Sequence, residues 1–110
     1  MKKALFLLML CVSASLSSQV LSERERAKVY DEILAERFNK LLPELMDRVG
    51  IDMWLVISRE YNEDPVMRTM LPATWLNARR RTMLVFYRNK QAGTIEKLAV
   101  ARYDVGQNIT

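Results

Sequence analysis

Apolar residues in the segment 23–49 recur at steps of three and four, which places them along one face of a helix. Ser22 precedes this segment as a good N-cap, and Gly50 follows it as a residue suited to the position beyond the C-cap. Pro43 has no amide hydrogen for the helical ladder and would clash with the preceding turn. We therefore predict one long helix with a kink near Leu41–Leu42, or a second helix that begins at Pro43.

The next segment, residues 51–58, is a short and almost wholly apolar run. Such a run is typical of a strand buried on both faces, as in a sheet covered by helices, and Trp54 within it is expected in the core. Charged and polar residues follow at once. In open α/β sheets this end of a strand is where ligands and partner surfaces usually lie, although a solvated loop is the alternative. The candidate contact residues here are Arg59, Glu60, Tyr61, Asn62 and Asp64.

The second half of the chain predicts short elements. Asp64-Pro65 is an N-cap followed by a proline at the first helical position, and a further short helix is expected over 73–78. Strands are expected over 82–87 and 94–103, joined as an antiparallel hairpin by the polar turn 88–93. The predicted fold class is α/β: a partial mixed sheet of about three strands, with the long kinked N-terminal helix on one face. We expect it to be part of a larger domain.

Residues 1–18 have the order of a secretory signal peptide: a basic start, an apolar run, then small residues. Cleavage after Ala14, Ser15 or Ser18 would be chemically reasonable, and Ser18 is favoured. Cys11 raises the alternative of a lipid-modified cysteine, but the bulky Leu10 stands where a small residue is expected. The run is too short for a membrane span, so we expect an exported, periplasmic or extracellular protein without a stable membrane anchor.

The net charge changes when this segment is set aside. The full chain has 17 basic and 13 acidic residues, or +4, and without Lys2 and Lys3 the balance is 15 minus 13, or +2. The charge is thus weak support for nucleic acid, and no nucleic-acid partner is expected. The one basic cluster, Arg79-Arg80-Arg81, could bind phosphates, with Trp75 as a stacking surface. Arginines next to a core strand, however, usually pair with carboxylates or lie on a subunit contact. The candidate contact residues of this region are Trp75, Arg79, Arg80 and Arg81.

Residue types limit the chemistry. The chain has no histidine, and its one cysteine, Cys11, lies in the predicted signal peptide. Serine–histidine and cysteine–histidine catalysis and most transition-metal sites are therefore excluded. Glu60, Glu63 and Asp64 could in principle hold a hard cation, but their spacing matches no calcium loop and Asp64 is better used as a helix cap. We assign no catalytic and no metal-ligating residue to this sequence.

Five segments of the sequence, taken in order, form a recognisable pattern: Leu41-Leu42-Pro43, Gly50 to Ile57, Arg59 to Pro65, Arg79 to Phe86 and Lys97 to Arg102. With these segments, residues 19–110 resemble the amino-terminal domain of secreted bacterial Xaa-Pro aminopeptidase-like proteins. These belong to the aminopeptidase P and creatinase group of pita-bread metallopeptidases. The most specific part is a patterned stretch, residues 59–65, and not a catalytic signature.

The resemblance implies a two-domain enzyme, in which an α/β amino-terminal domain shapes the substrate entrance and helps to form a homo-oligomer. A C-terminal pita-bread domain would hold two divalent metal ions (manganese, zinc or cobalt) through two Asp, one His and two Glu. A metal-bound water would there cleave the peptide bond before proline. None of those ligands can be carried over to this sequence, so the chain alone is not expected to hydrolyse peptides. The alternative is a stand-alone secreted protein-interaction module without enzymatic activity.

Overall fold

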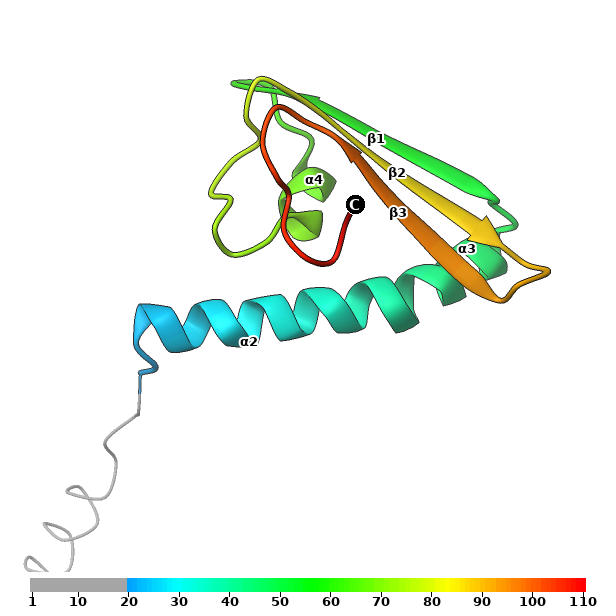
Figure 1. Ribbon diagram of the computed structural model, residues 1–110, viewed down its shortest axis with the longest axis horizontal. Coiled ribbons are helices and arrows are strands. Elements are labelled where there is room, and N and C mark those ends of the chain that lie inside the picture. The colour runs from blue at the N-terminus through cyan, green and yellow to red at the C-terminus, as the bar shows by residue number, and fades with distance from the viewer. Residues whose placement is uncertain (1–19) are drawn as a thin grey trace, which may run out of the picture.

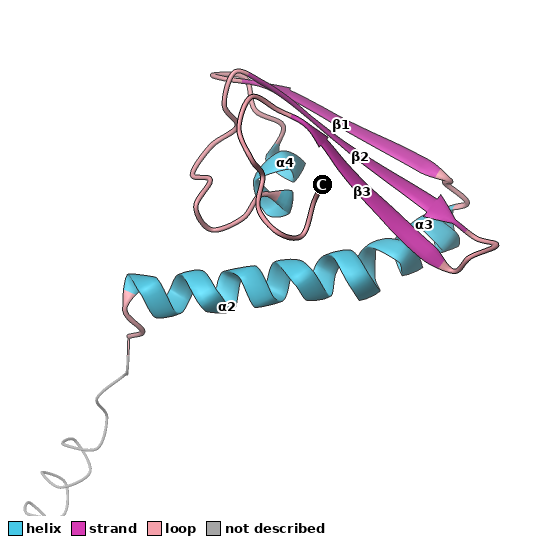
Figure 2. Ribbon diagram, in the orientation of Figure 1, coloured by secondary structure: helices cyan, strands magenta, loops and turns pink. Residues whose placement is uncertain are grey.

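The computed structural model describes residues 20–110, and the predicted signal peptide lies outside them. It confirms the predicted fold class: a long kinked N-terminal helix, a short helix and an open three-stranded sheet (Figures 1 and 2). The elements are α2 (Glu23–Glu36), the π-helical turn η1 (Arg37–Leu41), α3 (Leu42–Val49), β1 (Met53–Arg59), α4 (Pro65–Met70), β2 (Arg81–Asn89) and β3 (Thr94–Val100).

The long helix begins and ends where its sequence predicts. Ser22 and Glu25 form a capping box, in which the Ser22 hydroxyl accepts from the Glu25 amide and the Glu25 carboxylate accepts from the Ser22 amide. The Ser22 hydroxyl also donates to the Glu25 carboxylate at 2.8 Å, and this bond, together with the one from the Ser22 amide, lowers the pKa of Glu25. The π-helical turn ends at Leu41, two residues before Pro43, so the helix changes its pitch where a kink was predicted. Gly50 ends the helix in the left-handed conformation, with φ of 75°.

The sheet has the strand order β1-β2-β3, and both pairings are antiparallel, including the predicted hairpin of β2 and β3. The crossover through α4 therefore joins antiparallel neighbours, and the three strands contain no parallel pair. A parallel-type contact occurs at the outer edge of β3. There the Thr110 amide donates to the Lys97 carbonyl (3.0 Å) and the Ala99 amide donates to the Thr110 carbonyl (2.7 Å), on either side of Leu98.

The hydrophobic core lies on one side of the sheet. In Figure 1, α2, α4 and the C-terminal segment all lie on this side. Phe38 of the π-helical turn meets Phe86 of β2 with ring centroids 5.4 Å apart, and Trp54 of β1 meets Phe86 at 6.0 Å. The other buried apolar side chains of this core are Leu34, Leu42, Met46, Val56, Met67, Met70, Leu71, Ala78, Leu84, Val105 and Ile109.

The expectation that β1 is buried on both faces is wrong for this structure. Its residues alternate: Val56 is 3% exposed, whereas Leu55 is 55% exposed and Ile57 57% exposed. Trp54 is half-buried and packs against the core, as predicted. The physical reason is that helix and loops cover only the inner side of the sheet, and no element of residues 20–110 lies over the outer side (Figure 1).

Two boundaries also differ from the prediction. Residues 73–78 form turns and bends where a short helix was expected, because the Ala73 amide donates to Asp31 of α2 (2.9 Å) and the chain turns at Trp75. The strand predicted over 94–103 ends at Val100, and the chain then folds inward so that Val105 and Ile109 reach the core.

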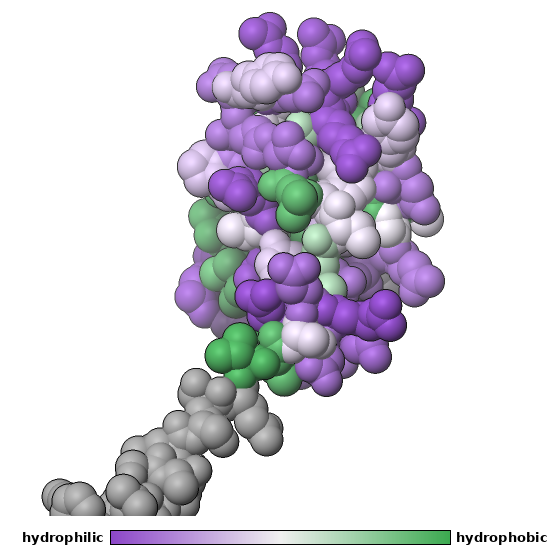
Figure 3. Space-filling model, turned by 90° about the vertical axis from the view of Figure 1, so that its left-hand side faces the viewer, coloured by the Kyte–Doolittle hydropathy of each residue, from purple (hydrophilic) through white to green (hydrophobic). Residues whose placement is uncertain are grey.

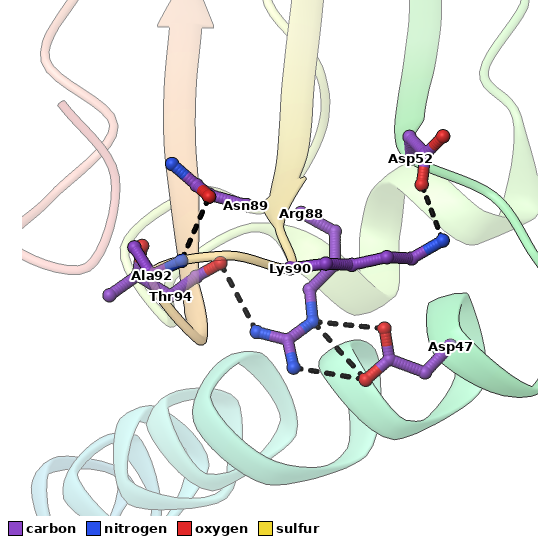
Figure 4. Close-up of polar contacts among 7 residues, drawn as sticks. All are labelled: Asp47, Asp52, Arg88, Asn89, Lys90, Ala92 and Thr94. Atoms are coloured by element: carbon purple, nitrogen blue, oxygen red, sulfur yellow. Dashed lines mark hydrogen bonds and ion pairs between the residues drawn. The ribbon is translucent and has the colours of Figure 1, made fainter.

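A polar cluster ties the end of the long helix to the β2–β3 hairpin (Figure 4). The Arg88 guanidinium donates to the Asp47 carboxylate from Nε (3.1 Å to Oδ1) and from Nη2 (2.9 Å to Oδ2). Its third nitrogen, Nη1, donates to the Thr94 carbonyl at 3.2 Å. Lys90 pairs with Asp52 at 2.6 Å. The hydrogen bond from Arg88 holds the pKa of Asp47 below its usual range, and the bond to Asp52 raises the pKa of Lys90. The hairpin is thus anchored by charge-assisted bonds.

Asp47→Asn is expected to lower the unfolding midpoint in urea at neutral pH, because it removes an anion that the Arg88 guanidinium stabilises in the folded state. A lowered pKa in the folded state gives stability above the unfolded pKa of about 4, and this stability is lost as the pH falls through the folded value. The difference between the two proteins should therefore shrink below about pH 4. Denaturation monitored by circular dichroism across this range checks the prediction.

The control is Glu32→Gln, which removes an exposed carboxylate that has no ion pair within residues 20–110. It should leave the midpoint at neutral pH unchanged. An effect of Asp47→Asn that stays the same from neutral pH down to about pH 2 would contradict the prediction.

Candidate functional site

Six of the nine predicted contact residues lie together where β1 ends and β2 begins. They line a shallow hollow of about 490 Å³, which we call the arginine hollow. It is built from the turn after β1 and from the start of β2, which come together because the antiparallel register places Arg59 opposite Arg81. The residues of the arginine hollow are Arg59, Glu60, Tyr61, Asn62, Arg80 and Arg81.

The two segments of the arginine hollow are bonded to each other through Glu60 and Arg80. The Glu60 amide donates to the Arg80 carbonyl (2.6 Å), and the Arg80 amide donates to the Glu60 carboxylate (3.2 Å). Tyr61 and Arg80 both have a positive backbone angle φ, of 67° and 53°, which residues other than glycine rarely adopt. Tyr61 is 95% exposed, so its ring stands out into solvent beside the hollow. The backbone is therefore held in an uncommon conformation at the rim.

The arginine hollow carries an excess of positive charge, because three arginines line it with one carboxylate, that of Glu60. Arg59 and Arg81 are exposed and lie directly opposite each other on neighbouring strands, an arrangement in which like charges destabilise a sheet. Neither of them, nor Arg80, forms an ion pair with a carboxylate of residues 20–110. A guanidinium group offers several N–H donors in a fixed plane that matches a carboxylate. The hollow is thus suited to contact an acidic side chain or a carboxylate from another surface.

The other three candidates lie outside the arginine hollow. Asp64 caps α4, where its carboxylate accepts from the Val66 amide at 2.8 Å. Trp75 is half-buried, and its indole N–H donates to the Asp104 carbonyl at 3.0 Å. The Arg79 guanidinium contacts the rings of both Trp75 and Tyr103, 5.9 Å and 5.4 Å from their centroids. Trp75 and Arg79 therefore hold the C-terminal segment against the α4–β2 loop.

Sequence reasoning missed the side of the sheet that faces away from α2, because it treated the apolar run of β1 as buried on both faces. The strand register aligns the outward side chains in rows across all three strands, such as Leu55–Val85–Leu98 and Ile57–Met83–Val100. We call this surface the outer face. Its apolar residues are Met53, Leu55, Ile57, Met83, Val85, Tyr87, Leu98 and Val100.

The loop end of the molecule has a different character. Figure 3 shows this end as mostly hydrophilic, with apolar side chains in small separate groups. Scattered apolar side chains of this kind are normal on a protein surface, whereas a continuous apolar sheet face marks a contact surface. The sequence of β1 has no signal for the outer face, because burial alternates along the strand whereas its apolar run is almost unbroken.

No group of three or more histidine, cysteine, aspartate or glutamate side chains within residues 20–110 could hold a metal ion. The two metal ions implied by the resemblance do not fit these residues, and the resemblance itself assigns them to another domain. None of the described helices is both long and apolar enough to cross a membrane. Comparison of the chain with protein-family models, with curated proteins and with solved structures gives no match.

Proposed function

We propose that this chain is a non-catalytic contact domain, corresponding to the amino-terminal domain of a secreted Xaa-Pro aminopeptidase-like metallopeptidase. Its role is to contact other protein surfaces, within an oligomer and around the substrate entrance. The cleavage of peptides before proline, with two divalent metal ions, belongs to a pita-bread domain outside this sequence. The order of the segments that carry the resemblance supports this proposal, and so does the α/β architecture with its long kinked helix.

The outer face is the observation that carries the proposal. A finished soluble domain rarely leaves eight neighbouring apolar side chains of a sheet uncovered. The arginine hollow lies at one end of the same face. Along β1 and β2 every second residue faces outward, and the pair Arg59–Arg81 is the last outward pair, at the opposite end from Met53–Tyr87. An apolar centre with a charged border is the usual composition of a protein contact surface.

The proposal predicts that the purified chain has no peptidase activity. The chain and a full-length Xaa-Pro aminopeptidase-like protein are assayed side by side on an Xaa-Pro peptide with manganese, and only the full-length protein should release the first residue. Turnover by the chain alone, at a rate that rises with its concentration and withstands further purification, would reject the division of roles.

A second observation tests the resemblance itself. We expect the reading frame that contains this sequence to continue for roughly 300 codons, the size of a further domain or two. Those codons should contain the set of two Asp, one His and two Glu. A stop codon directly after Thr110 would instead favour the stand-alone interaction module.

A further inference from the structure

The outer face is large enough to be one half of a stable interface. Met53, Leu55, Ile57, Tyr87, Leu98 and Val100 each expose between 37% and 57% of their surface. Together with the half-buried Met83 and Val85 they present on the order of 600 Å² of apolar surface, against about 800 Å² that each partner buries in a standard interface. Polar and charged residues at the rim of the face would supply the remaining buried area.

The charges on the outer face are separated toward its two ends. Arg59 and Arg81 lie at one end, and Glu96 of β3 lies in the row at the other end, beside Met53 and Tyr87. All three charged side chains are exposed, and none forms an ion pair within residues 20–110. The face therefore has a positive end and a negative end with an apolar centre between them.

This polarity makes the face complementary to itself in one orientation. Two copies that stack face to face with their strands antiparallel bring the arginine end of each onto the Glu96 end of the other. With parallel strands, the two arginine ends would meet and repel. A two-fold interface uses the same patch on both copies, as such a surface requires.

We propose that the outer face binds the outer face of a second copy of this chain, with the strands of the two copies antiparallel across the interface. The two sheets then form a sandwich about 10 Å thick, with their strand directions within about 30° of antiparallel. The dimer would bury the apolar rows of both copies and place carboxylates near the unpaired arginines. This inference rests on the proposed contact role of the chain and names the partner and the surface.

The experiment measures the mass of the purified full chain by sedimentation velocity over a hundredfold range of concentration. The unchanged chain should pass from monomer to dimer. Leu55→Lys places a charge at the centre of the outer face and should raise the dissociation constant at least about tenfold. Leu45→Lys is the matched control, because Leu45 is also an exposed leucine (39%) but lies on α3. It should leave the dissociation constant unchanged, and circular dichroism verifies that both variants fold.

Charge reversal tests the orientation. Glu96→Arg puts positive charge at both ends of the face and should weaken the dimer, with a smaller effect at high salt. Arg81→Glu combined with Glu96→Arg exchanges the charges of the two ends and should restore much of the affinity. Failure of the double variant to bind better than Glu96→Arg would overturn the antiparallel arrangement.

A chain that remains monomeric at every concentration would overturn the inference, and so would equal weakening by Leu45→Lys and Leu55→Lys. Hydroxyl-radical footprinting of Met53 and Met83 in a longer protein that carries this chain separates this failure from failure of the proposed function. Protection of both methionines in a monomeric longer protein would assign the outer face to the rest of that polypeptide. The second-copy inference would then be wrong and the contact role retained.

Discussion

Val56→Asp is expected to unfold the domain, whereas Leu55→Asp, one residue earlier in β1, is expected to leave it folded. Val56 is 3% exposed and faces the core, and Leu55 is 55% exposed on the outer face. An unpaired carboxylate buried without hydrogen-bond partners costs several kcal/mol, a large part of the roughly 5–15 kcal/mol that stabilises a typical domain. On the outer face the carboxylate stays hydrated. Far-UV circular dichroism with urea denaturation distinguishes the two variants.

These measurements are made at a protein concentration at which the chain is monomeric, so that loss of a dimer does not contribute to the result. Val56→Ala serves as the control, because it shortens the same side chain without adding a charge and should cost less than Val56→Asp. Equal unfolding by Val56→Asp and Leu55→Asp would contradict the one-sided burial of β1. It would show instead that both sides of the strand are enclosed in the native state.

Phe86→Ala is expected to reduce the free energy of unfolding by about 3–5 kcal/mol, the usual cost of emptying a buried phenylalanine site. Phe86 is fully buried and contacts both Phe38 of the helix and Trp54 of the neighbouring strand. It therefore joins the long helix to the sheet, and the cavity left by alanine lies between two layers that cannot close over it. Urea denaturation at neutral pH gives the change in midpoint.

Leu76→Ala is the control for this measurement, since Leu76 is an apolar side chain that is 81% exposed and its loss should change stability by less than about 0.5 kcal/mol. The double variant Phe38→Ala/Phe86→Ala should cost less than the sum of the two single variants, because each one already removes the ring contact. A strictly additive result, or an effect of Phe86→Ala no larger than that of Leu76→Ala, would contradict the position of Phe86 in the core.

Local residue chemistry was sufficient to predict the elements. The helix start at Ser22, its end at Gly50 and the start of α4 at Asp64-Pro65 all depend on hydrogen bonds and backbone angles within a few residues of each position. The hairpin of β2 and β3 is equally local, because a short polar turn can join only neighbouring antiparallel strands. These features were predicted correctly because residues within a few positions determine them, although distant pairs such as Arg88–Asp47 add bonds to the hairpin.

The prediction failed where distant residues compete. The turn over 73–78 depends on Asp31, some 42 residues away along the chain, whose carboxylate accepts from the Ala73 amide. Trp75 and Arg79, named as candidate contact residues, pack against Tyr103 and Asp104 of the C-terminal segment, which no local pattern in the sequence indicates. Only six of the nine candidates meet in the arginine hollow, since that grouping follows from the register of β1 against β2.

The sequence by itself determined the long helix, the start of α4 and the presence of three strands, because caps, prolines, glycines and apolar spacing act through neighbours in the chain. The tertiary structure alone decided which side of each strand is covered. A run such as Leu55-Val56-Ile57 is apolar at every position, so its composition does not distinguish the side that meets α2 from the side left open. That distinction comes from how helix and sheet pack on each other. This packing places the arginine hollow and the outer face together on the uncovered side of the domain.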